Sequence, residues 1–291
     1  MNELIESALI PVVRERLATA ATADKRDGTG TKHQQAALLS LKIIDIACGS
    51  GHMLLAAARR VGKELARLRT GEDEPAPERV REAIRDVISH CIYSVDRNPL
   101  AVDLCRVALW LESHTAGKPL TFLDHRIRCG DSLVGVFDVG VLAQGIPDKA
   151  FDPCEGDDKA TARNAARQNR EERRGAQDLF ALRDSGEAEA LTRHSRDVDA
   201  IADDSPELIR RKKELFEASH RDPAWLRQKQ ACDLWTAAFF QNLSTLNSQP
   251  STPVITSAAL ADHLGGKPID ARLHGCAGTL ALRQPFFHWP L

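Results

Sequence analysis

Three aspartates have the spacing of ligand-binding acids in an open α/β protein. Asp45 precedes the small-residue turn ACGSG, Asp96 ends the segment CIYSVD, and Asp131 follows the segment RIRCG. In open parallel sheets a ligand lies at the carboxyl ends of the strands, where side chains and backbone N–H groups converge. The sequence therefore predicts three acids at one edge of a sheet.

These residue types suit a nucleoside. The Asp96 carboxylate can accept hydrogen bonds from both ribose hydroxyls, as acids at this place do in dinucleotide-binding folds. Asp131 could accept a hydrogen bond from an adenine amine, and an acidic pocket would also favour a sulfonium charge. Gly49 and Gly51 can adopt backbone conformations closed to other residues, which lets the main chain approach a ligand closely. None of these contacts requires a phosphate.

Other kinds of site fit less well. The segment GSGHML has the first two glycines of the dinucleotide motif GxGxxG, but Leu54 takes the place of the third, and no GK[ST] motif follows. The seven cysteines form no CxxC pair and the ten histidines no HExxH motif, so we predict no metal site and no disulfide framework. Cys48 is interpreted as a small buried thiol within the turn, because no base lies near it in sequence.

The elements that position these acids follow from the apolar pattern and the helix-start signals. Strands alternate with helices, which predicts a parallel sheet with helices on both faces, that is, a doubly wound α/β fold. The expected elements are a helix over 2–19, a loop over 20–35, a strand over 41–46, a helix from about 53, a helix from Pro77 to about His90, a strand over 91–96, a helix with Pro99 in its first turn, and a strand ending near Asp131.

The composition of the chain changes after about residue 150. Residues 155–183 hold seven Lys or Arg against six Asp or Glu, which indicates an exposed helix or a linker of mixed charge. Asp222 and Pro223 form a helix-start signal, and a short helix is expected over 257–264. The run RRKK at 210–213 could bind phosphates, but glutamates flank it and a solvated helix face is favoured.

Composition limits the class of protein. Of 291 residues 43% are hydrophobic and 27% charged, as in ordinary globular proteins. The 39 basic residues nearly balance the 41 acidic ones, so the chain as a whole indicates no polyanionic partner. No apolar run reaches the length of a membrane span, and the N-terminus carries acids where a signal peptide would be basic and then apolar. We therefore expect neither membrane insertion nor export, and a cytoplasmic location.

Three segments resemble the first three cofactor-binding motifs of a known family. The segments DIACGSGHMLLAAARR, IYSVDRNPLAVDLCRVALWLESH and IRCGDSLVG are similar to those of the adenine-specific DNA methyltransferases of type IIG restriction enzymes and phage-exclusion systems. The resemblance is dense over the first half of the chain, and the tail FFHWPL resembles the lead-in to the catalytic strand. It implies an incomplete Rossmann-like methyltransferase fold with a mainly helical insertion, and S-adenosylmethionine as cofactor.

The resemblance also implies a role for each motif. The first motif would hold the methionine part of the cofactor, and Asp96 would bind the ribose. Arg97 and Asn98 would lie beside the adenine, and Asp131 and Ser132 would contact the edge of the adenine. The implied cofactor-binding residues are Asp45, Ala47, Cys48, Gly49, Ser50, Gly51, Asp96, Arg97, Asn98, Asp131 and Ser132.

The departures from the family concern three motifs. Ile46 stands where the family usually has proline, and no Thr-Pro loop precedes the first helix. The [ND]PP[YFW] motif, which binds the flipped adenine, is absent because the sequence contains no Pro-Pro. The segment NPL at 98–100 belongs to a helix start and is no substitute. No catalytic residue is assigned, and we expect the chain to stop before the catalytic strand and to be inactive alone.

The expected organisation has four parts. These are an N-terminal helix and loop over 1–35, the cofactor-binding domain over 36–140, a charged helical insertion over 141–270, and a lead-in to the catalytic strand over 271–291. The expected partners are double-stranded DNA and, in a split enzyme, a second chain carrying the catalytic and target-recognition parts. Two alternatives stay open: a methyltransferase acting on RNA or protein, and a non-catalytic cofactor-binding fragment.

Overall fold

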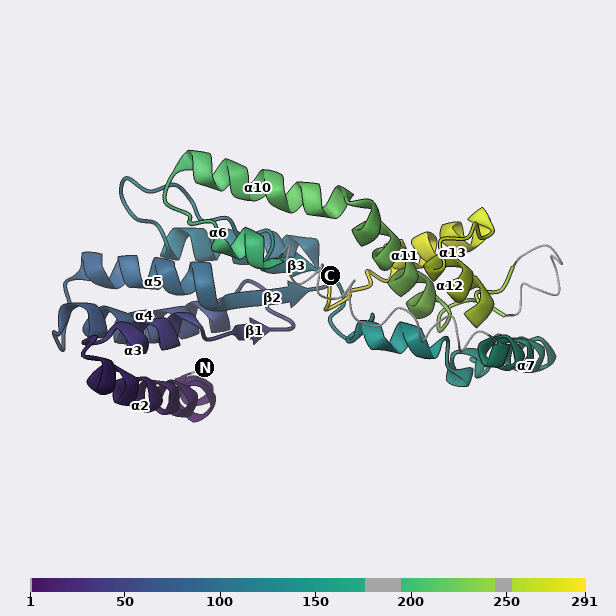
Figure 1. Ribbon diagram of the computed structural model, residues 1–291, viewed down its shortest axis with the longest axis horizontal. Coiled ribbons are helices and arrows are strands. Elements are labelled where there is room, and N and C mark those ends of the chain that lie inside the picture. The colour runs from purple at the N-terminus through teal and green to yellow at the C-terminus, as the bar shows by residue number, and fades with distance from the viewer. Residues whose placement is uncertain (1, 176–194, 244–252) are drawn as a thin grey trace. The chain divides into compact units, whose positions relative to one another are not determined.

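The computed structural model describes residues 2–175, 195–243 and 253–291 (Figure 1). The protein is a mixed α/β chain, mostly helical, with one small parallel sheet among these residues. It divides into two compact units. Unit 1 comprises Met1–Gly130 with Val198–Leu215, and unit 2 comprises Asp131–Asp197 with Phe216–Leu291.

The N-terminal region is more helical than the apolar pattern predicts. Helix α1 (Asn2–Leu4), a π-helical turn (Ile5–Leu9) and α2 (Ile10–Asp27) follow one another, and α3 covers Lys32–Leu39. The expected loop over 20–35 is therefore wrong. The buried Asp24 explains it: its carboxylate accepts hydrogen bonds from the Thr29 hydroxyl and from the backbone N–H groups of His33 and Gln34, and so joins the end of α2 to the start of α3.

The sheet contains three short parallel strands. They are β1 (Ile43–Asp45), β2 (Ile92–Asp96) and β3 (Ile127–Cys129), in the order β1-β2-β3. Ile43 is paired with Ile92, and Ser94 with Ile127. The predicted parallel pairing is confirmed, although β1 is shorter than expected. Parallel pairing brings the carboxyl ends of β1 and β2 to the same edge of the sheet.

Three helices of unit 1 follow the predicted start signals and form its core. They are α4 (His52–Thr70), α5 (Pro77–Cys91) and α6 (Pro99–Glu112). Helix α4 packs on α5, where Gly62 lies so close to Ile84 that a Cβ atom at 62 would be 2.5 Å from its side chain. Leu54, Val61 and Ile88 belong to the surrounding buried cluster, and each such side chain contributes roughly 1.5–3 kcal/mol.

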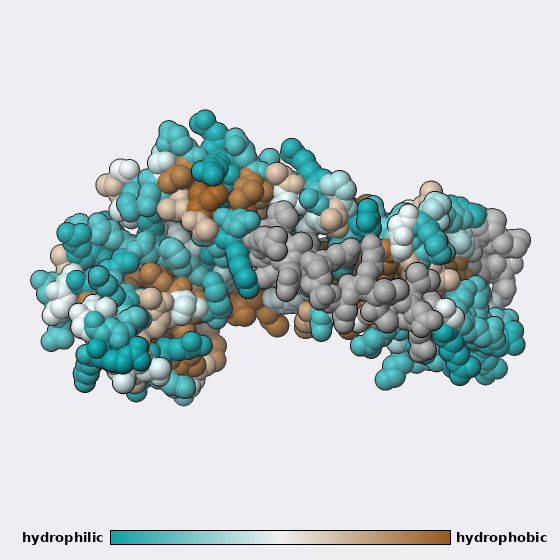
Figure 2. Space-filling view, in the orientation of Figure 1, coloured by the Kyte–Doolittle hydropathy of each residue, from teal (hydrophilic) through white to brown (hydrophobic). Residues whose placement is uncertain are grey.

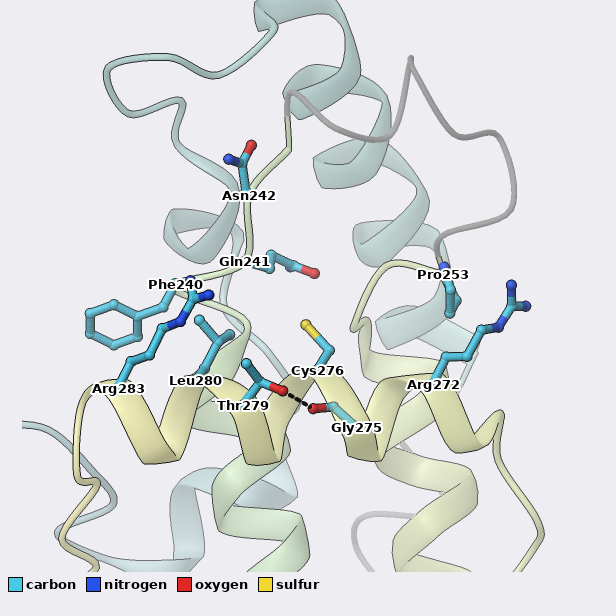
Figure 3. A pocket seen from close by; sticks show the side chains of 10 residues that line it. All are labelled: Phe240, Gln241, Asn242, Pro253, Arg272, Gly275, Cys276, Thr279, Leu280 and Arg283. Carbon is cyan, nitrogen blue, oxygen red and sulfur yellow. Dashed lines mark hydrogen bonds between the residues drawn. The ribbon is translucent and has the colours of Figure 1, made fainter.

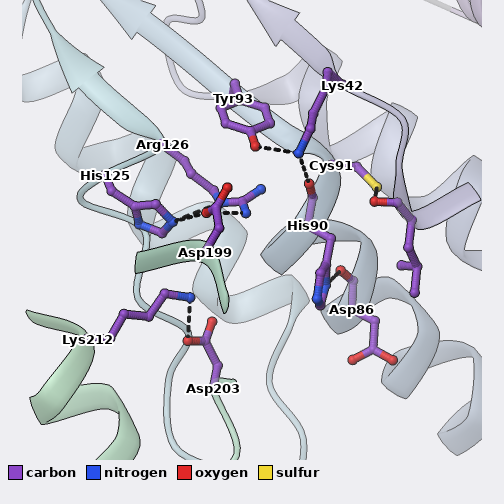
Figure 4. A network of polar contacts seen from close by, with 11 residues as sticks. Lys42, Asp86, His90, Cys91, Tyr93, His125, Arg126, Asp199, Asp203 and Lys212 are labelled. Atoms are coloured by element: carbon purple, nitrogen blue, oxygen red, sulfur yellow. Dashed lines mark hydrogen bonds and ion pairs between the residues drawn. The ribbon is translucent and has the colours of Figure 1, made fainter. Parts of the chain in front are cut away.

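The segment Val198–Leu215 is distant in sequence and joins the rest of unit 1 through an ion pair with Arg126. It also contains a buried ion pair of its own (Figure 4). Arg126 Nη2 lies 2.6 Å from Asp199 Oδ1, and its guanidinium lies over the ring of Tyr93. Lys212 Nζ, near the start of α10 (Pro206–Arg221), lies 3.0 Å from Asp203 Oδ1, and both residues are buried. The RRKK run is thus not a uniformly solvated face, because Lys212 is inside.

Unit 2 is helical in its regular elements. It contains the 3-10 helices η2 (Val139–Gln144) and η3 (Asp148–Phe151) and the helices α7 (Lys159–Gly175), α11 (Pro223–Ala237), α12 (Ser257–Leu264) and α13 (Ala271–Arg283). Asp222 caps α11 as predicted, and the short helix over 257–264 is confirmed. Of the charged segment 155–183, residues 159–175 are helical, and 176–183 lie outside the described residues.

The tail after α13 runs parallel to the start of unit 2. The Asp131 N–H donates to the Pro285 carbonyl, the Phe287 N–H to Val134, and the Trp289 N–H to Val136. Asp131 accordingly belongs to unit 2, and unit 1 extends to Gly130 in this part of the chain. The expected lead-in over 271–291 begins as helix α13, and only its last residues are extended.

None of the helices in the described ranges has the length and apolarity of a membrane span.

The first prediction concerns the buried pair in unit 1. Replacing Lys212 by methionine leaves the Asp203 carboxylate buried without its cation, which should lower the free energy of unfolding by about 3–5 kcal/mol. Urea denaturation measures this change in the free energy of unfolding. Lys25→Met on the exposed face of α2 is the control and should change stability by less than about 0.5 kcal/mol. Equal losses of stability from the two substitutions would show that the Lys212–Asp203 pair does not stabilise the segment 198–215.

The second prediction concerns pH. Burial alone would raise the pKa of Asp199, but hydrogen bonding to His125 and the charge of Arg126 hold that pKa below its ordinary value of 3.8. A depressed folded-state pKa stabilises the protein above the unfolded-state value, and this stabilisation is lost as pH falls through the folded-state value. The stability difference between wild type and Asp199→Asn should be about 2 kcal/mol at pH 7. It should shrink below about pH 4. Urea titrations at a series of pH values test this, and a constant difference would contradict it.

Candidate functional site

The turn between β1 and α4 is a glycine loop with two left-handed residues. Gly49 has φ +53° and Gly51 has φ +83°. The loop is closed by the Gly51 N–H, which donates to the Cys48 carbonyl at 2.8 Å. The Cys48 N–H donates to the Val95 carbonyl at 3.3 Å, which attaches the loop to the end of β2.

Asp96 connects this loop to β2. Its Oδ2 accepts a hydrogen bond from the Gly49 N–H at 2.8 Å, and its Oδ1 accepts one from the Asn98 N–H at 2.8 Å. A carboxylate offers about four lone-pair sites, so each oxygen can accept a further hydrogen bond. The half-buried Asp96 can therefore fix the loop and still bind hydroxyl groups of a ligand.

Asp45 lies at the end of β1, half-buried beside the same loop. Its Oδ1 accepts a hydrogen bond from the Ala47 N–H at 3.1 Å, and within the described residues its Oδ2 has no partner. A Cβ atom built on Gly49 would meet nothing within 4 Å, so open space adjoins the loop there. Ser50 forms a 2.8 Å hydrogen bond with the ring of His52 at the start of α4.

Arg97 and Asn98 lie exposed between β2 and α6. The Asn98 Oδ1 accepts a hydrogen bond from the Leu100 N–H at 3.0 Å and caps α6. This bond leaves the Asn98 amide NH₂ as the group available to a ligand. The signal for the cap, asparagine followed by Pro99, is local in the sequence.

Asp131 and Ser132 belong to unit 2 and are already engaged there. Asp131 Oδ1 accepts from the Leu133 N–H at 3.1 Å, and Oδ2 accepts from the Gln284 side chain at 2.5 Å. The buried Ser132 accepts a hydrogen bond from the Trp289 indole through its backbone carbonyl at 3.1 Å. Unit 1 thus holds nine of the predicted residues on one loop and the adjoining strand ends, and unit 2 holds these two.

Cys105 is a neighbour of the loop that the sequence analysis did not identify. A Cβ atom at Gly51 would lie 2.7 Å from the Cys105 Sγ, so this thiol occupies the space beside the loop. The hydrogen bond between the two thiols lowers the pKa of Cys48 and raises that of Cys105. The signal was available, because Val102, Cys105 and Leu109 form the buried stripe of α6.

Unit 2 holds a buried Asp–His pair that the sequence analysis also missed. His288 Nε2 lies 2.9 Å from Asp233 Oδ1, and its Nδ1 accepts from the Val136 N–H at 3.1 Å. Lys229 Nζ lies 2.6 Å from the other Asp233 oxygen, Oδ2. Both ring nitrogens have partners, so the pair fixes the tail. In the described parts of the chain no three His, Cys, Asp or Glu residues form a metal site.

A cavity of about 580 Å³ lies along α13 in unit 2 (Figure 3). Its mouth carries two arginines, of which Arg272 is paired with Asp270, and the Thr279 hydroxyl donates to the Gly275 carbonyl. None of the predicted cofactor-binding residues lines it. The lining residues are Phe240, Gln241, Asn242, Pro253, Arg272, Gly275, Cys276, Thr279, Leu280 and Arg283.

Comparison with known proteins gives one informative similarity. Over 110 residues, 34% of this chain, the sequence is 30% identical to a protein of Methanocaldococcus jannaschii named "Putative type II restriction enzyme and methyltransferase". The match covers 9% of that protein's length. No protein-family model and no solved structure matches the chain.

The third prediction separates the two loop glycines. Gly49→Ala meets no neighbour and should cost only the roughly 1–2 kcal/mol of a left-handed alanine. Gly51→Ala should cost more, because its Cβ also clashes with the Cys105 thiol. Urea denaturation measures both.

The control is a double variant. Cys105→Ala removes the sulfur atom, so it should recover the steric part of the Gly51→Ala loss and leave the backbone part. Equal losses for the two glycines, or no recovery in the double variant, would be inconsistent with this packing.

Proposed function

We propose that this chain is the S-adenosylmethionine-binding part of an adenine-specific (N6) DNA methyltransferase of the restriction-modification or phage-exclusion kind. The proposal includes a Rossmann-like methyltransferase fold in which β1, β2 and β3 form one end of the sheet. It draws support from the three motifs and from the similarity to a protein named for restriction and methyltransferase activities.

The observation that carries the proposal is the Gly49–Asp96 hydrogen bond. It joins a left-handed glycine, with open space beside it, to a carboxylate that retains acceptor capacity. A nucleoside needs both features, a main chain that it can approach and an acid for its ribose. The residues present therefore fit the cofactor without a metal or a phosphate-binding loop.

The proposed role of each residue follows from what it has left to offer. Asp96 accepts from the ribose hydroxyls, and Asp45 Oδ2 with the backbone from Ala47 to Gly51 faces the methionine part. Arg97 and the Asn98 amide NH₂ lie beside the adenine. In the proposal Asp131 and Ser132 address the adenine edge.

The cofactor supplies the methyl group and its own leaving group, so the task of this chain is positioning. The chain has no [ND]PP[YFW] motif to receive the flipped adenine. In the proposal it binds the cofactor and transfers no methyl group to DNA by itself. A second segment or chain carrying that motif completes the enzyme.

The fourth prediction is calorimetric. The purified chain should bind S-adenosylmethionine saturably, and Asp96→Ala should weaken binding at least tenfold, because it removes charge-assisted hydrogen bonds worth about 1.5–3 kcal/mol each. Asp96→Asn retains an oxygen that can accept from Gly49, and so separates loss of the ligand contact from loss of the loop.

The matched control is Asp103→Asn, an exposed carboxylate on α6, which should leave the affinity unchanged. Urea denaturation of each variant checks that it is folded. A folded wild-type chain without saturable binding, or equal binding by wild type and Asp96→Ala, would overturn the proposal.

A further inference from the structure

Helix α7 carries a stripe of basic side chains along one face. Lys159, Arg163, Arg167, Arg170 and Arg174 are spaced three or four residues apart and are all exposed. Residues at this spacing lie above one another on an α-helix. At 1.5 Å per residue the stripe is about 22 Å long.

The opposite face of α7 is fixed by Asn169, which is fully buried. Its amide nitrogen donates to the Ile146 carbonyl at 2.8 Å, and its amide oxygen accepts from the Ser257 N–H and hydroxyl, both at 2.8 Å. Because both ends of the amide are held, the helix cannot rotate about its axis without breaking buried hydrogen bonds. The basic stripe is therefore held toward solvent.

Neither acid of α7 forms an ion pair with this stripe within the described residues, although the exposed Glu171 lies four positions after Arg167 and three before Arg174. The helix contains six basic and two acidic residues, although the whole chain has a net charge of −2. Glu172 accepts hydrogen bonds from the Ala258 N–H and from Gln168, away from the stripe. Arg170 is paired with Asp148, but no partner of the other four cations is found within the described ranges. In the space-filling view the surface at α7 is hydrophilic throughout (Figure 2).

We propose that this face of α7 binds the phosphate backbone of double-stranded DNA. A duplex carries one negative charge per about 1.7 Å of its axis, so a 22 Å length has about a dozen phosphates, and those on the near side can contact the stripe. Arginine suits phosphate because its planar guanidinium donates two parallel hydrogen bonds. Contacts to phosphates position a protein on DNA without reading its sequence. The choice of DNA as the polyanion rests on the proposed function.

The experiment is fluorescence anisotropy with a labelled duplex of mixed sequence, titrated with the full chain from roughly 50 to 200 mM salt. The test variant replaces Arg163, Arg167 and Arg174 by glutamine. Since each phosphate contact contributes about 0.9 to the slope of log affinity against log salt, the slope should become shallower by about 2–3. The affinity at low salt should fall at least about tenfold.

A charge-matched control replaces Arg14, Arg16 and Lys25 on α2, which are exposed and have no ion pair in the part of the chain that the structure describes. It should keep the wild-type slope. An unchanged slope in the α7 variant, or an equal loss in both variants, would overturn the inference. So would equal competition by poly-glutamate at matched charge, which would indicate an acidic protein as the partner.

Calorimetry with S-adenosylmethionine on the same samples separates this inference from the proposed function. The α7 variant should retain the affinity of wild type for the cofactor. If cofactor binding is intact and DNA binding does not depend on α7, the inference alone fails. If DNA binding depends on α7 and no cofactor binds, the proposed function fails.

Discussion

The hydrogen bond between the Gly49 N–H and the Asp96 carboxylate is the contact on which the arrangement of the candidate site depends. It exists because β1 and β2 are adjacent and parallel, so that the residues following them meet at one edge of the sheet. The glycine loop turns sharply. Its Cys48 N–H donates to Val95 of β2, whereas its Gly49 N–H has no backbone partner in the strand and donates instead to the Asp96 carboxylate at the end of β2. This hydrogen bond holds the left-handed conformation of Gly49 in place.

The same few residues determine where α6 begins. Asp96 accepts from the Asn98 N–H, and Asn98 in turn caps α6, so the helix starts at a fixed distance from the strand. That start places Cys105 against Gly51, where only a residue without a side chain fits. Loop, strand end and helix thus constrain one another. A substitution at any of them changes the space beside Gly49, which the proposed cofactor would use.

What could be predicted from the sequence was mainly local. The starts of α5 and α11 follow from a proline and, for α11, from an aspartate cap, and the parallel strands follow from apolar segments alternating with helices. The helical residues of 20–35, at the end of α2 and the start of α3, were missed, because their arrangement depends on the buried Asp24 accepting from residues up to ten positions away. The return of 198–215 to unit 1 was also missed. Its ion pairs with the rest of unit 1, such as the one between Arg126 and Asp199, join residues more than seventy positions apart. The periodicity of the sequence does not reveal such contacts.

In the candidate site, too, local features were predictable and contacts between distant residues were not. The glycine loop and Asp96 were predictable as a motif, whereas the engagement of Asp131 by Gln284 depends on a tail more than 150 residues later. Cys105 lay in a visible helical stripe, but only the fold shows which loop that stripe contacts. Sequence motifs therefore identify which residues can bind a ligand. They do not show which hydrogen-bonding capacity the fold has already used.

The net charge of a segment does not show how its charged residues are distributed around a helix. The near balance over 155–183 predicts a mixed surface, yet helical spacing collects the basic residues of α7 on one side while Glu172 is engaged on another. The contiguous run at 210–213 is the opposite case. Four consecutive residues spread around a helix at about 100° each, so they form no stripe, and Lys212 is buried against Asp203. The proposed polyanion-binding surface therefore rests on cations spaced along one side of a helix whose other face is fixed, and not on an uninterrupted run of cations in the sequence.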